Sequence, residues 1–306
     1  MSRRVTPAHR AEFAAYRAVA GIAARVGEPA ALSVGAAIGG FVYRPLGIRR
    51  QVAEDNLRRA FPERDEDWVR RTARAAYRHL GREAVAMLRL PRLDRAEILR
   101  RVVVPPAQLE ALARAAARGR GVVIATGHFG SWEMAGATLA ALGHRVTAIY
   151  KRLSNPLLDR EVRATREAVG MRLIDRWDSS RAGLDALARG DVLAVVADQD
   201  ARRRGIFVPF FGRPASTYRG AALMALRAGA PLFLGYARRG PDGYIGSVEE
   251  VDASREGPAD EVVHRLTAAF TARLEAAIRE APEQYFWQHR RWKTAPPEEP
   301  RDAAAV

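Results

Sequence analysis

The hydrophobic and polar positions divide the chain into a helical first part and a second part of alternating short apolar runs and helical patterns. Between residues 49 and 90, apolar residues such as Val52, Leu57 and Leu80 recur near a 3.6-residue period, with arginines between them. Phe61-Pro62 interrupts this pattern, because proline disfavours a helical conformation in the residue before it. We therefore expect two amphipathic helices here.

The second part begins with Gly121–Thr126, a β-branched run that suits a buried strand. Further strands are expected at residues 146–150, 171–174, 192–197, 232–236 and 244–248. Helical patterns lie at residues 107–118, 132–142, 156–169, 180–189, 221–228 and 259–280, and residues 198–220 read as a loop. Such alternation is typical of an α/β fold with a mostly parallel central sheet flanked by helices.

The N-terminal part contains 13 consecutive uncharged residues, Ala30–Val42. This run is shorter than the roughly 18 apolar residues of a membrane-spanning helix. It fits either a helix lying in a membrane interface or a Gly/Ala-rich helix packed on the protein body. We expect an N-terminal helical membrane-associating segment at 1–48, an α/β domain at 49–296 and a disordered acidic tail at 297–306.

The charge is strongly positive, with 50 basic and 35 acidic residues among 306. Lys151 and Lys293 are the only lysines, a bias that a GC-rich genome can produce. Codon bias does not explain the excess of basic residues, which lies over the first three quarters of the chain. Residues 1–120 carry 24 basic and 12 acidic side chains, and residues 151–240 carry 17 and 9. This excess indicates a surface for anionic lipid, a phosphorylated substrate or nucleic acid. The chain has no cysteine, which excludes disulfides and a thiol nucleophile.

The most informative chemistry lies in Thr126–Gly136, where His128 follows a predicted strand and Glu133 begins a predicted helix. Sites in parallel sheets form at the carboxyl ends of strands, and Gly127 and Gly130 permit a tight turn. If Glu133 reaches back to His128, it fixes the imidazole tautomer and makes a base that can take a proton from a hydroxyl. The spacing alone also fits a histidine that merely ends the strand.

Other reaction types lack their sequence patterns. There is no Gly-x-Ser-x-Gly turn, no glycine-rich phosphate loop and no metal-ligand spacing. We therefore expect direct transfer assisted by a base, with no cofactor and no metal.

Several polar segments also follow predicted strands, on the same side of the sheet as His128. A basic triplet at 202–204 then precedes an apolar run, which together suit a substrate with a charged head and an apolar tail. The candidate substrate-binding residues are Gly130, Ser131, Trp132, Tyr150, Lys151, Arg152, Asn155, Asp198, Asp200, Arg204, Ser216 and Thr217. Phe207, Phe210 and Phe211 are candidates for an acyl groove. The alternatives are a solvated basic face and phenylalanines in the core.

The segment 282–294 interleaves aromatic and basic residues. This pattern indicates contact with lipid or phosphate, or a final element that docks through its aromatic rings.

Together these segments resemble the late acyltransferases of lipid A biosynthesis, the lauroyl/myristoyl transferase family. The matching pieces are Asp55-Asn56-Leu57 with Phe61-Pro62, GHFGSWEMAG, YKRLSNP, ADQDARRRGIFVPFFGRPAST and PEQYFWQHRRWKT. They occur in the family's order across residues 40–296. The resemblance implies a glycerophosphate-acyltransferase-like α/β core with an N-terminal helical membrane anchor.

The resemblance also implies transfer of a fatty acyl chain from acyl carrier protein or acyl-CoA to a hydroxyl of a phosphorylated glycolipid, above all a lipid A precursor. It implies work on an anionic membrane, at the cytoplasmic face of the cell inner membrane. His128 matches the family's base, Glu133 its partner and Arg166 an arginine that meets phosphate, while Asp198 and Asp200 match the family's Asp-Gln-Asp. Backbone N–H groups near Gly130, or Arg152 and Arg166, would stabilise the oxyanion.

Three alternatives stay open. The acceptor could be another glycolipid, such as a phosphatidylinositol mannoside, or an ornithine or glycerol lipid. The chain could be a non-catalytic lipid-binding protein, or the charge could serve nucleic acid. We expect no nucleic-acid partner, because the basic residues form no recognised binding motif.

Overall fold

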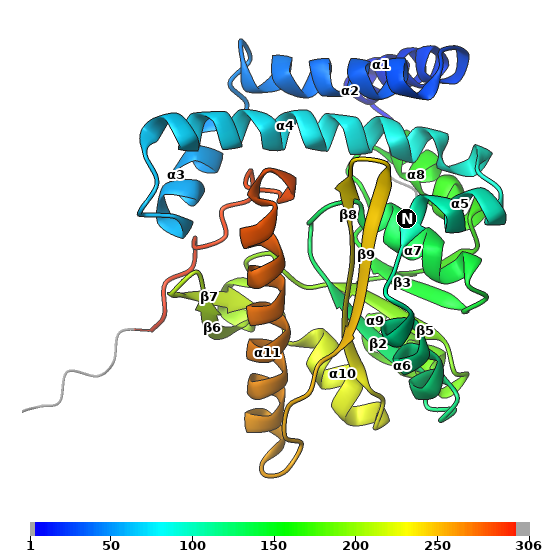
Figure 1. Cartoon of the computed structure of the whole chain (residues 1–306), viewed down its shortest axis with the longest axis vertical. Helices are drawn as coiled ribbons and strands as arrows, with labels where there is room; N and C mark the ends of the chain where they lie inside the picture. The colour runs from blue at the N-terminus through cyan, green and yellow to red at the C-terminus, as the bar shows by residue number, and fades with distance from the viewer. Residues whose placement is uncertain (1–3, 298–306) are drawn as a thin grey trace, which may run out of the picture.

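The computed structural model describes residues 4–297. Its central sheet consists of β1 (Val102–Val103), β2 (Val122–Thr126), β3 (Val146–Tyr150), β4 (Met171–Asp175), β5 (Val192–Val196), β8 (Leu232–Gly240) and β9 (Gly243–Glu250). The strands lie in the order β1-β9-β8-β2-β5-β3-β4 (Figure 1). β8, β2, β5, β3 and β4 are parallel, and β9 and β1 run the opposite way. The predicted α/β fold with a mostly parallel sheet is confirmed.

Helices cover both faces of this sheet. One face packs against α6 (Pro106–Ala116) and α7 (Trp132–Ala141), with α5 (Arg95–Arg101) beside α7 and α8 (Pro156–Ala168) at β4. The other packs against α9 (Ser179–Ala188), α10 (Gly220–Ala228) and α11 (Ala259–Glu280). Val122 and Ile124 of β2 face the α6 side, and Val123 and Ala125 belong to the core on the opposite face. Burial on both faces explains why β2 is apolar throughout.

A helical layer lies across the end of the molecule where the parallel strands finish (Figure 1). It contains α1 (Pro7–Arg25), α2 (Glu28–Tyr43), α3 (Arg50–Ala60) and α4 (Glu66–Arg89). α2 packs closely on α4, because a side chain at Gly39 would overlap the carbonyl oxygen of Tyr77. Among residues 4–297, the helices are either too short or too polar to cross a bilayer.

The helices on either side of Phe61-Pro62 are confirmed, and the predicted helix at 30–42 lies inside α2. The segment at 198–220 is not a plain loop. It contains a 3-10 turn η2 (Arg202–Arg204) and a hairpin of β6 (Ile206–Phe210) and β7 (Arg213–Thr217). Its strand pattern is hidden because Pro209 pairs with Pro214, and proline is unusual inside a sheet.

Three shorter elements lie outside the sequence expectations: α5, β1 and a 3-10 turn η1 (Leu90–Arg92). After α11, η3 (Pro282–Gln284) leads into irregular backbone with Tyr285 and Trp287 buried in the main core. This segment therefore docks through its aromatic rings. The predicted acidic tail at 297–306 lies outside the described residues from 298 onward, and the boundary between 48 and 49 stays a prediction.

Candidate active site

His128 forms a hydrogen-bonded pair with Asp198. β2 and β5 pair in parallel with Thr126 opposite Val196, so the residues two positions beyond each strand lie side by side. His128 Nδ1 lies 2.8 Å from Asp198 Oδ1, and the His128 backbone N–H donates to Asp198 Oδ2 over 2.8 Å. The Asp198 side chain is buried. Its two hydrogen bonds fix both the turn and the imidazole ring.

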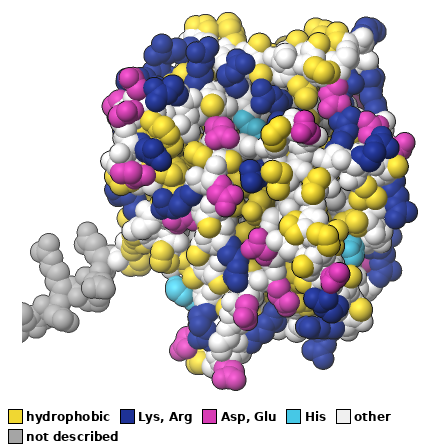
Figure 2. All heavy atoms as spheres, viewed as in Figure 1, with side chains coloured by type: hydrophobic (Ala, Val, Ile, Leu, Met, Phe, Trp, Pro, Cys, Tyr) yellow, Lys and Arg dark blue, Asp and Glu magenta, His cyan; other side chains and the backbone are white. Residues whose placement is uncertain are grey.

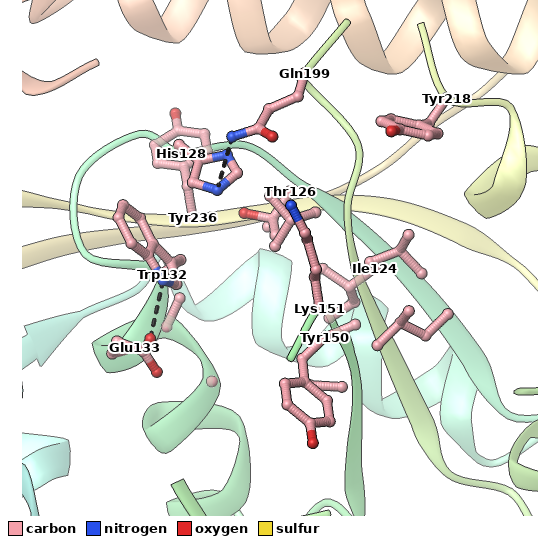
Figure 3. Close-up of a pocket in the computed structure, with 18 of the residues that line it drawn as sticks. Ile124, Thr126, His128, Trp132, Glu133, Tyr150, Lys151, Gln199, Tyr218 and Tyr236 are labelled. Carbon is pink, nitrogen blue, oxygen red and sulfur yellow. Dashed lines mark hydrogen bonds between the residues drawn. The ribbon is translucent and has the colours of Figure 1, made fainter. Parts of the chain in front are cut away.

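This pairing determines the tautomer of His128. Because an ionised carboxylate only accepts hydrogen bonds, Nδ1 carries the proton and Nε2 carries the free lone pair. Nε2 faces the amide of Gln199 at 3.4 Å (Figure 3). Burial alone would lower the pKa of His128, but the charge and hydrogen bond of Asp198 outweigh it, and the pKa lies above its ordinary value of 6.5.

Asp198 stays ionised for the same reason. Burial alone would raise the pKa of Asp198, but the charge and hydrogen bonds of His128 hold that pKa below its usual value. A buried carboxylate beside an imidazole stabilises the protonated ring, which is the state a general base reaches after it takes a proton.

Glu133 contacts Arg166, and this corrects the expectation that it orients His128. Arg166 donates to the Glu133 carboxylate from Nη2 over 2.6 Å and from Nε over 2.9 Å. Trp132 Nε1 donates to Glu133 Oε1 over 3.0 Å (Figure 3). Glu133 lies in the first turn of α7, from which its side chain reaches α8, whereas the strand register places Asp198 beside His128. Glu133 therefore holds Arg166 and Trp132, and the Trp132 ring centre lies 5.1 Å from that of His128.

A cavity of about 1960 Å³ opens around His128. One part is basic, with side chains from the residue before α3, from α8, from the strand ends, from 202–204 and from the C-terminal segment. These are Arg49, Lys151, Arg166, Arg176, Arg202, Arg203, Arg204, Arg290 and Lys293. The other part is an apolar slot between α7 and the sheet, lined by Val102, Val104, Leu109, Ile124, Ala135, Gly136, Leu139, Leu142, Ala148, Met171, Ala194, Ala237, Gly246 and Val248. The cavity therefore has room for a charged group and an apolar chain, and His128 lines it where β2 ends and α7 begins.

Several predicted site residues line this cavity together: His128, Trp132, Glu133, Tyr150, Lys151, Arg166, Asp200 and Arg204. Figure 3 shows Tyr150 and Lys151 entering from the end of β3, across from Trp132 and Glu133. Asp200 is buried, and its Oδ2 accepts a hydrogen bond from the Thr294 hydroxyl over 3.0 Å. The other Asp200 oxygen is buried without a hydrogen bond among the described residues.

Four predicted substrate-binding side chains instead bond to other parts of the protein: three to backbone groups and one to a carboxylate. Asn155 caps α8 by accepting from the Leu157 N–H over 3.0 Å. Ser216 and Thr217 are fully buried, and their hydroxyls donate to backbone carbonyls at 2.6 and 2.9 Å. Arg152 pairs with Asp175 at 2.6 Å and does not line the cavity.

Two backbone N–H groups of the glycine turn, those of Gly130 and Ser131, already donate hydrogen bonds within the protein. Gly130 donates to the Gln284 carbonyl over 3.0 Å, and Ser131 donates to the Ala237 carbonyl over 2.7 Å. Neither of these two N–H groups is available for an oxyanion, so the other expected donors, the basic side chains, are left for that role. The turn itself needs glycine, because φ at Gly130 is +60° and an added side chain would overlap the Ala237 carbonyl.

The predicted acyl groove is also corrected. Phe210 and Phe211 are buried in the main core with Phe61 and Trp287, and none of Phe207, Phe210 and Phe211 lines the cavity. The aromatic pairs Phe61–Phe211 and Phe210–Phe211 have ring centres 5.1 and 4.8 Å apart. These rings anchor the β6–β7 hairpin, and the apolar wall of the cavity lies under α7 instead.

Other cavity residues went unrecognised in the sequence. They are Gln199, Arg49, Arg176, Trp177 and Tyr218. His289, Arg290 and Lys293 also line the cavity, and they belong to the segment 282–294, for which the sequence indicates contact with lipid or phosphate. The sequence could have indicated Gln199, because it lies between two candidate aspartates directly after a predicted strand. No sequence pattern indicates Arg49, because it reaches the site only through the packing of the helical layer. Within residues 4–297, no three His, Asp or Glu side chains are grouped so that they could hold a metal ion.

A base held by a buried acid, beside a cavity with one cationic and one apolar part, is typical of an enzyme that acts on an amphiphilic molecule. Comparison with known families makes the class specific. The chain belongs to the bacterial lipid A biosynthesis acyltransferases, whose family model matches residues 3–294, and it is an acyltransferase.

Named relatives agree with this membership. The chain is 28% identical over 271 residues to the lipid A biosynthesis lauroyltransferase of Escherichia coli (strain K12). These aligned residues cover 88% of this chain and 87% of the relative. It is equally similar to the palmitoleoyltransferase of the same organism, over 88% of this chain and 86% of the relative. A phosphatidylinositol mannoside acyltransferase of Mycolicibacterium smegmatis is 29% identical over 67% of each chain.

Proposed function

We propose that this protein transfers a fatty acyl chain from a thioester, carried by acyl carrier protein or coenzyme A, to a hydroxyl of a phosphorylated glycolipid. The proposed acceptor is a lipid A precursor at the cytoplasmic face of the inner membrane. One observation carries the proposal: His128, paired with Asp198, presents Nε2 to a cavity that is basic in one part and apolar in the other. Family membership and the lipid A relatives support it.

In the proposed reaction, His128 Nε2 takes the proton from the acceptor hydroxyl, and the oxygen attacks the thioester carbonyl carbon. Asp198 stabilises the resulting imidazolium. When the tetrahedral intermediate collapses, the C–S bond breaks, the ester forms, and the thiolate leaves with the proton from His128. Gln199 lies 3.4 Å from Nε2, a long hydrogen bond that the acceptor hydroxyl would replace.

Of the two kinds of oxyanion donor that the sequence suggests, backbone N–H groups near Gly130 and basic side chains, we assign the role to the basic side chains. Arg166 donates hydrogen bonds from Nε and Nη2 to the Glu133 carboxylate, while its Nη1 has no hydrogen bond to the described residues. Arg166 and Lys151 both line the cavity with His128, so we assign them to the developing oxyanion. The arginines at 202–204 and Arg176 suit the acceptor phosphates, because a guanidinium binds phosphate bidentately.

We assign the apolar slot to the donor's acyl chain. Its floor contains Ile124, Ala194 and Ala148, which are in register on three neighbouring strands and all line the cavity. The two alanines leave room below α7. Burying a hydrocarbon chain there would contribute about 0.8 kcal/mol for each methylene.

A second candidate acceptor is a phosphatidylinositol mannoside. The relatives named for that activity favour it, with 29% identity over two thirds of the chain in one case. It has the same chemistry as the first acceptor, a hydroxyl on a phosphorylated glycolipid, and it uses the same His128.

The test is acyl transfer by the purified protein, with labelled acyl donors on both carriers and with both acceptors. We expect His128→Ala to lower the rate by at least about 100-fold, as expected for loss of a general base. His264→Ala is the matched control, because His264 is exposed and bonds only the Phe207 carbonyl. A folded His128→Ala protein with nearly normal activity would refute the assignment, and activity confined to mannosides would select the second acceptor.

A further inference from the structure

The segment 282–294 contacts both turns that form the catalytic pair, the one after β2 and the one after β5. In Figure 1 it is the red segment that leaves α11 and passes α3 and the β6–β7 hairpin. The Phe286 N–H donates to the His128 carbonyl over 3.0 Å, and Tyr285 pairs with Phe129 in an antiparallel bridge. The segment therefore runs along the turn after β2 like a short extra strand.

The same segment contacts the turn after β5 through a side chain. The Asp200 N–H donates to His289 Nε2 over 3.0 Å. Asp198, two residues earlier, holds Nδ1 of His128, and Gln199 between the two aspartates faces Nε2 of His128 at 3.4 Å (Figure 3). His289 therefore holds the backbone of the turn that supplies the neighbours of both ring nitrogens.

The His289 ring can accept this hydrogen bond only in its neutral form. Because Nε2 accepts from a backbone N–H, the proton lies on Nδ1. Burial lowers the pKa of His289, and the charges of Arg291 and His128 act in the same direction, against those of Asp198 and Asp200. The ring is therefore neutral near pH 7 and keeps its acceptor.

Asn56 of α3 fixes the backbone around His289. Its Nδ2 donates to the Trp287 carbonyl over 2.8 Å and to the His289 carbonyl over 2.6 Å. In Figure 2, acidic and basic side chains are interspersed over the face that carries α11, whereas these contacts lie below the surface, since Asn56 and Trp287 are 4% and 1% exposed. The position of His289 is therefore set inside the protein.

The two catalytic turns need such a support, because they extend beyond the sheet. The backbone ladder between β2 and β5 reaches Ala197, whose N–H donates to the Thr126 carbonyl over 2.9 Å. Further along, the contacts between His128 and Asp198 and those of the segment 282–294 hold the two turns together.

We propose that His289 is a positioning residue for the pair of His128 and Asp198, and that Asn56 acts through His289. By holding the Asp200 N–H, His289 Nε2 keeps the Asp198 carboxylate within hydrogen-bond distance of the His128 ring. The proposal rests on the proposed role of His128 as the base, and it assigns a task to two sequence pieces that the reaction itself does not use.

The test is titration of His128 by NMR in the full chain, with its signal assigned by the loss of that signal in His128→Ala. We expect His289→Phe, which keeps a ring but has no acceptor, to lower the pKa of His128, because a looser turn weakens the hydrogen bond to Asp198. The other charged groups near His128, Arg166 and Glu133, are the same in this variant. His289→Gln keeps an acceptor and should recover most of the pKa.

The rate of acyl transfer gives a second measurement. In His289→Phe, kcat should fall by about 10- to 100-fold, since a displaced general base is no longer aligned with the hydroxyl. Asn56→Ala should lower both kcat and the pKa of His128 as well.

Two matched controls separate positioning from general stability. His144→Phe changes another half-buried histidine, whose ring forms no hydrogen bond with the described residues. Asn155→Ala removes another buried amide that donates to a backbone carbonyl, here one of α1. Both controls should leave the pKa of His128 unchanged, even where thermal unfolding shows a loss of stability.

An unchanged pKa of His128 in a folded His289→Phe protein would overturn the proposal, and so would equal pKa values in His289→Phe and His289→Gln. If His289→Phe does not fold, His289→Ala takes its place in the same comparison. The titration needs no donor or acceptor. A lowered pKa in a protein that acylates neither acceptor would therefore support the positioning role and refute the proposed function.

Discussion

His128 owes its chemistry to one neighbouring residue, because Asp198 sets both its tautomer and its pKa. A base must be neutral to accept a proton, so kcat/KM should rise with pH through the pKa of His128, which lies above 6.5. The pH dependence of kcat/KM can therefore distinguish the residue that orients His128 from residues that only lie near it, because only the former should shift the pKa of His128 strongly.

Asp198→Asn should move the acidic limb of the pH profile to lower pH, since it removes the charge that raises the pKa of His128. The maximal rate should fall by about 100-fold or more, because an amide can donate to Nδ1 and leave the proton on Nε2. The measurement is kcat/KM against pH for purified variants.

Glu133→Gln is the comparison for that experiment. It weakens the bonds to Arg166 and should lower the rate, yet it should move the acidic limb less than Asp198→Asn does. A larger shift from Glu133→Gln would restore Glu133 as the partner of His128.

At the scale of elements, the slot between α7 and the sheet sets the space for an apolar chain. In Ala194→Leu, the larger side chain would occupy the floor between Ile124 and Ala148. The loss of contact for two methylenes of a long chain should lower kcat/KM for long-chain donors about tenfold relative to short-chain donors.

The control is Ala194→Ser, which keeps the volume of the side chain. A series of donors of increasing chain length measures the preference. An unchanged preference in a folded Ala194→Leu protein would place the acyl chain outside this slot.

Local sequence patterns are enough to predict most helices and strands, but they do not predict which elements contact each other. Phe61-Pro62 and the β-branched run of β2 were enough to predict two helices and a buried strand. The partner of His128 depends on β5 lying between β2 and β3, a strand order that chain order does not reveal. The spacing from His128 to Glu133 was informative about the location of the site, but the direction of Glu133 depends on Arg166, 33 residues away. Phe210 and Phe211 needed tertiary packing to be placed in the core.

For the whole molecule, α4 connects the helical layer to the catalytic turn. His79 of α4 is buried, and its Nε2 donates to the Gly130 carbonyl over 3.2 Å. Burial lowers the pKa of His79, so the ring is neutral near pH 7. One turn further, Glu83 pairs with Arg239 of β8 at 2.6 Å. α4 thus contacts α2 on one side and the turn before α7 on the other.

His79→Phe should lower both activity and stability, because the buried Gly130 carbonyl loses its donor at a cost of about 1–3 kcal/mol. His79→Gln keeps a donor and should recover part of both. Thermal unfolding and kcat are the measurements. If the two variants behave alike, the hydrogen bond does not position the turn.

The two-part cavity around His128 also bears on how the rate must be measured. If the cavity takes the proposed glycolipid from a membrane leaflet, the enzyme meets this acceptor in two dimensions, and the effective concentration is the mole fraction of glycolipid in the leaflet. Adding inert lipid at constant acceptor would then slow the reaction, although nothing in the bulk solution has changed. Once the acceptor has gained a chain, the product stays in the same leaflet and competes with fresh acceptor for the cavity. The composition of the membrane therefore becomes a kinetic variable of the enzyme.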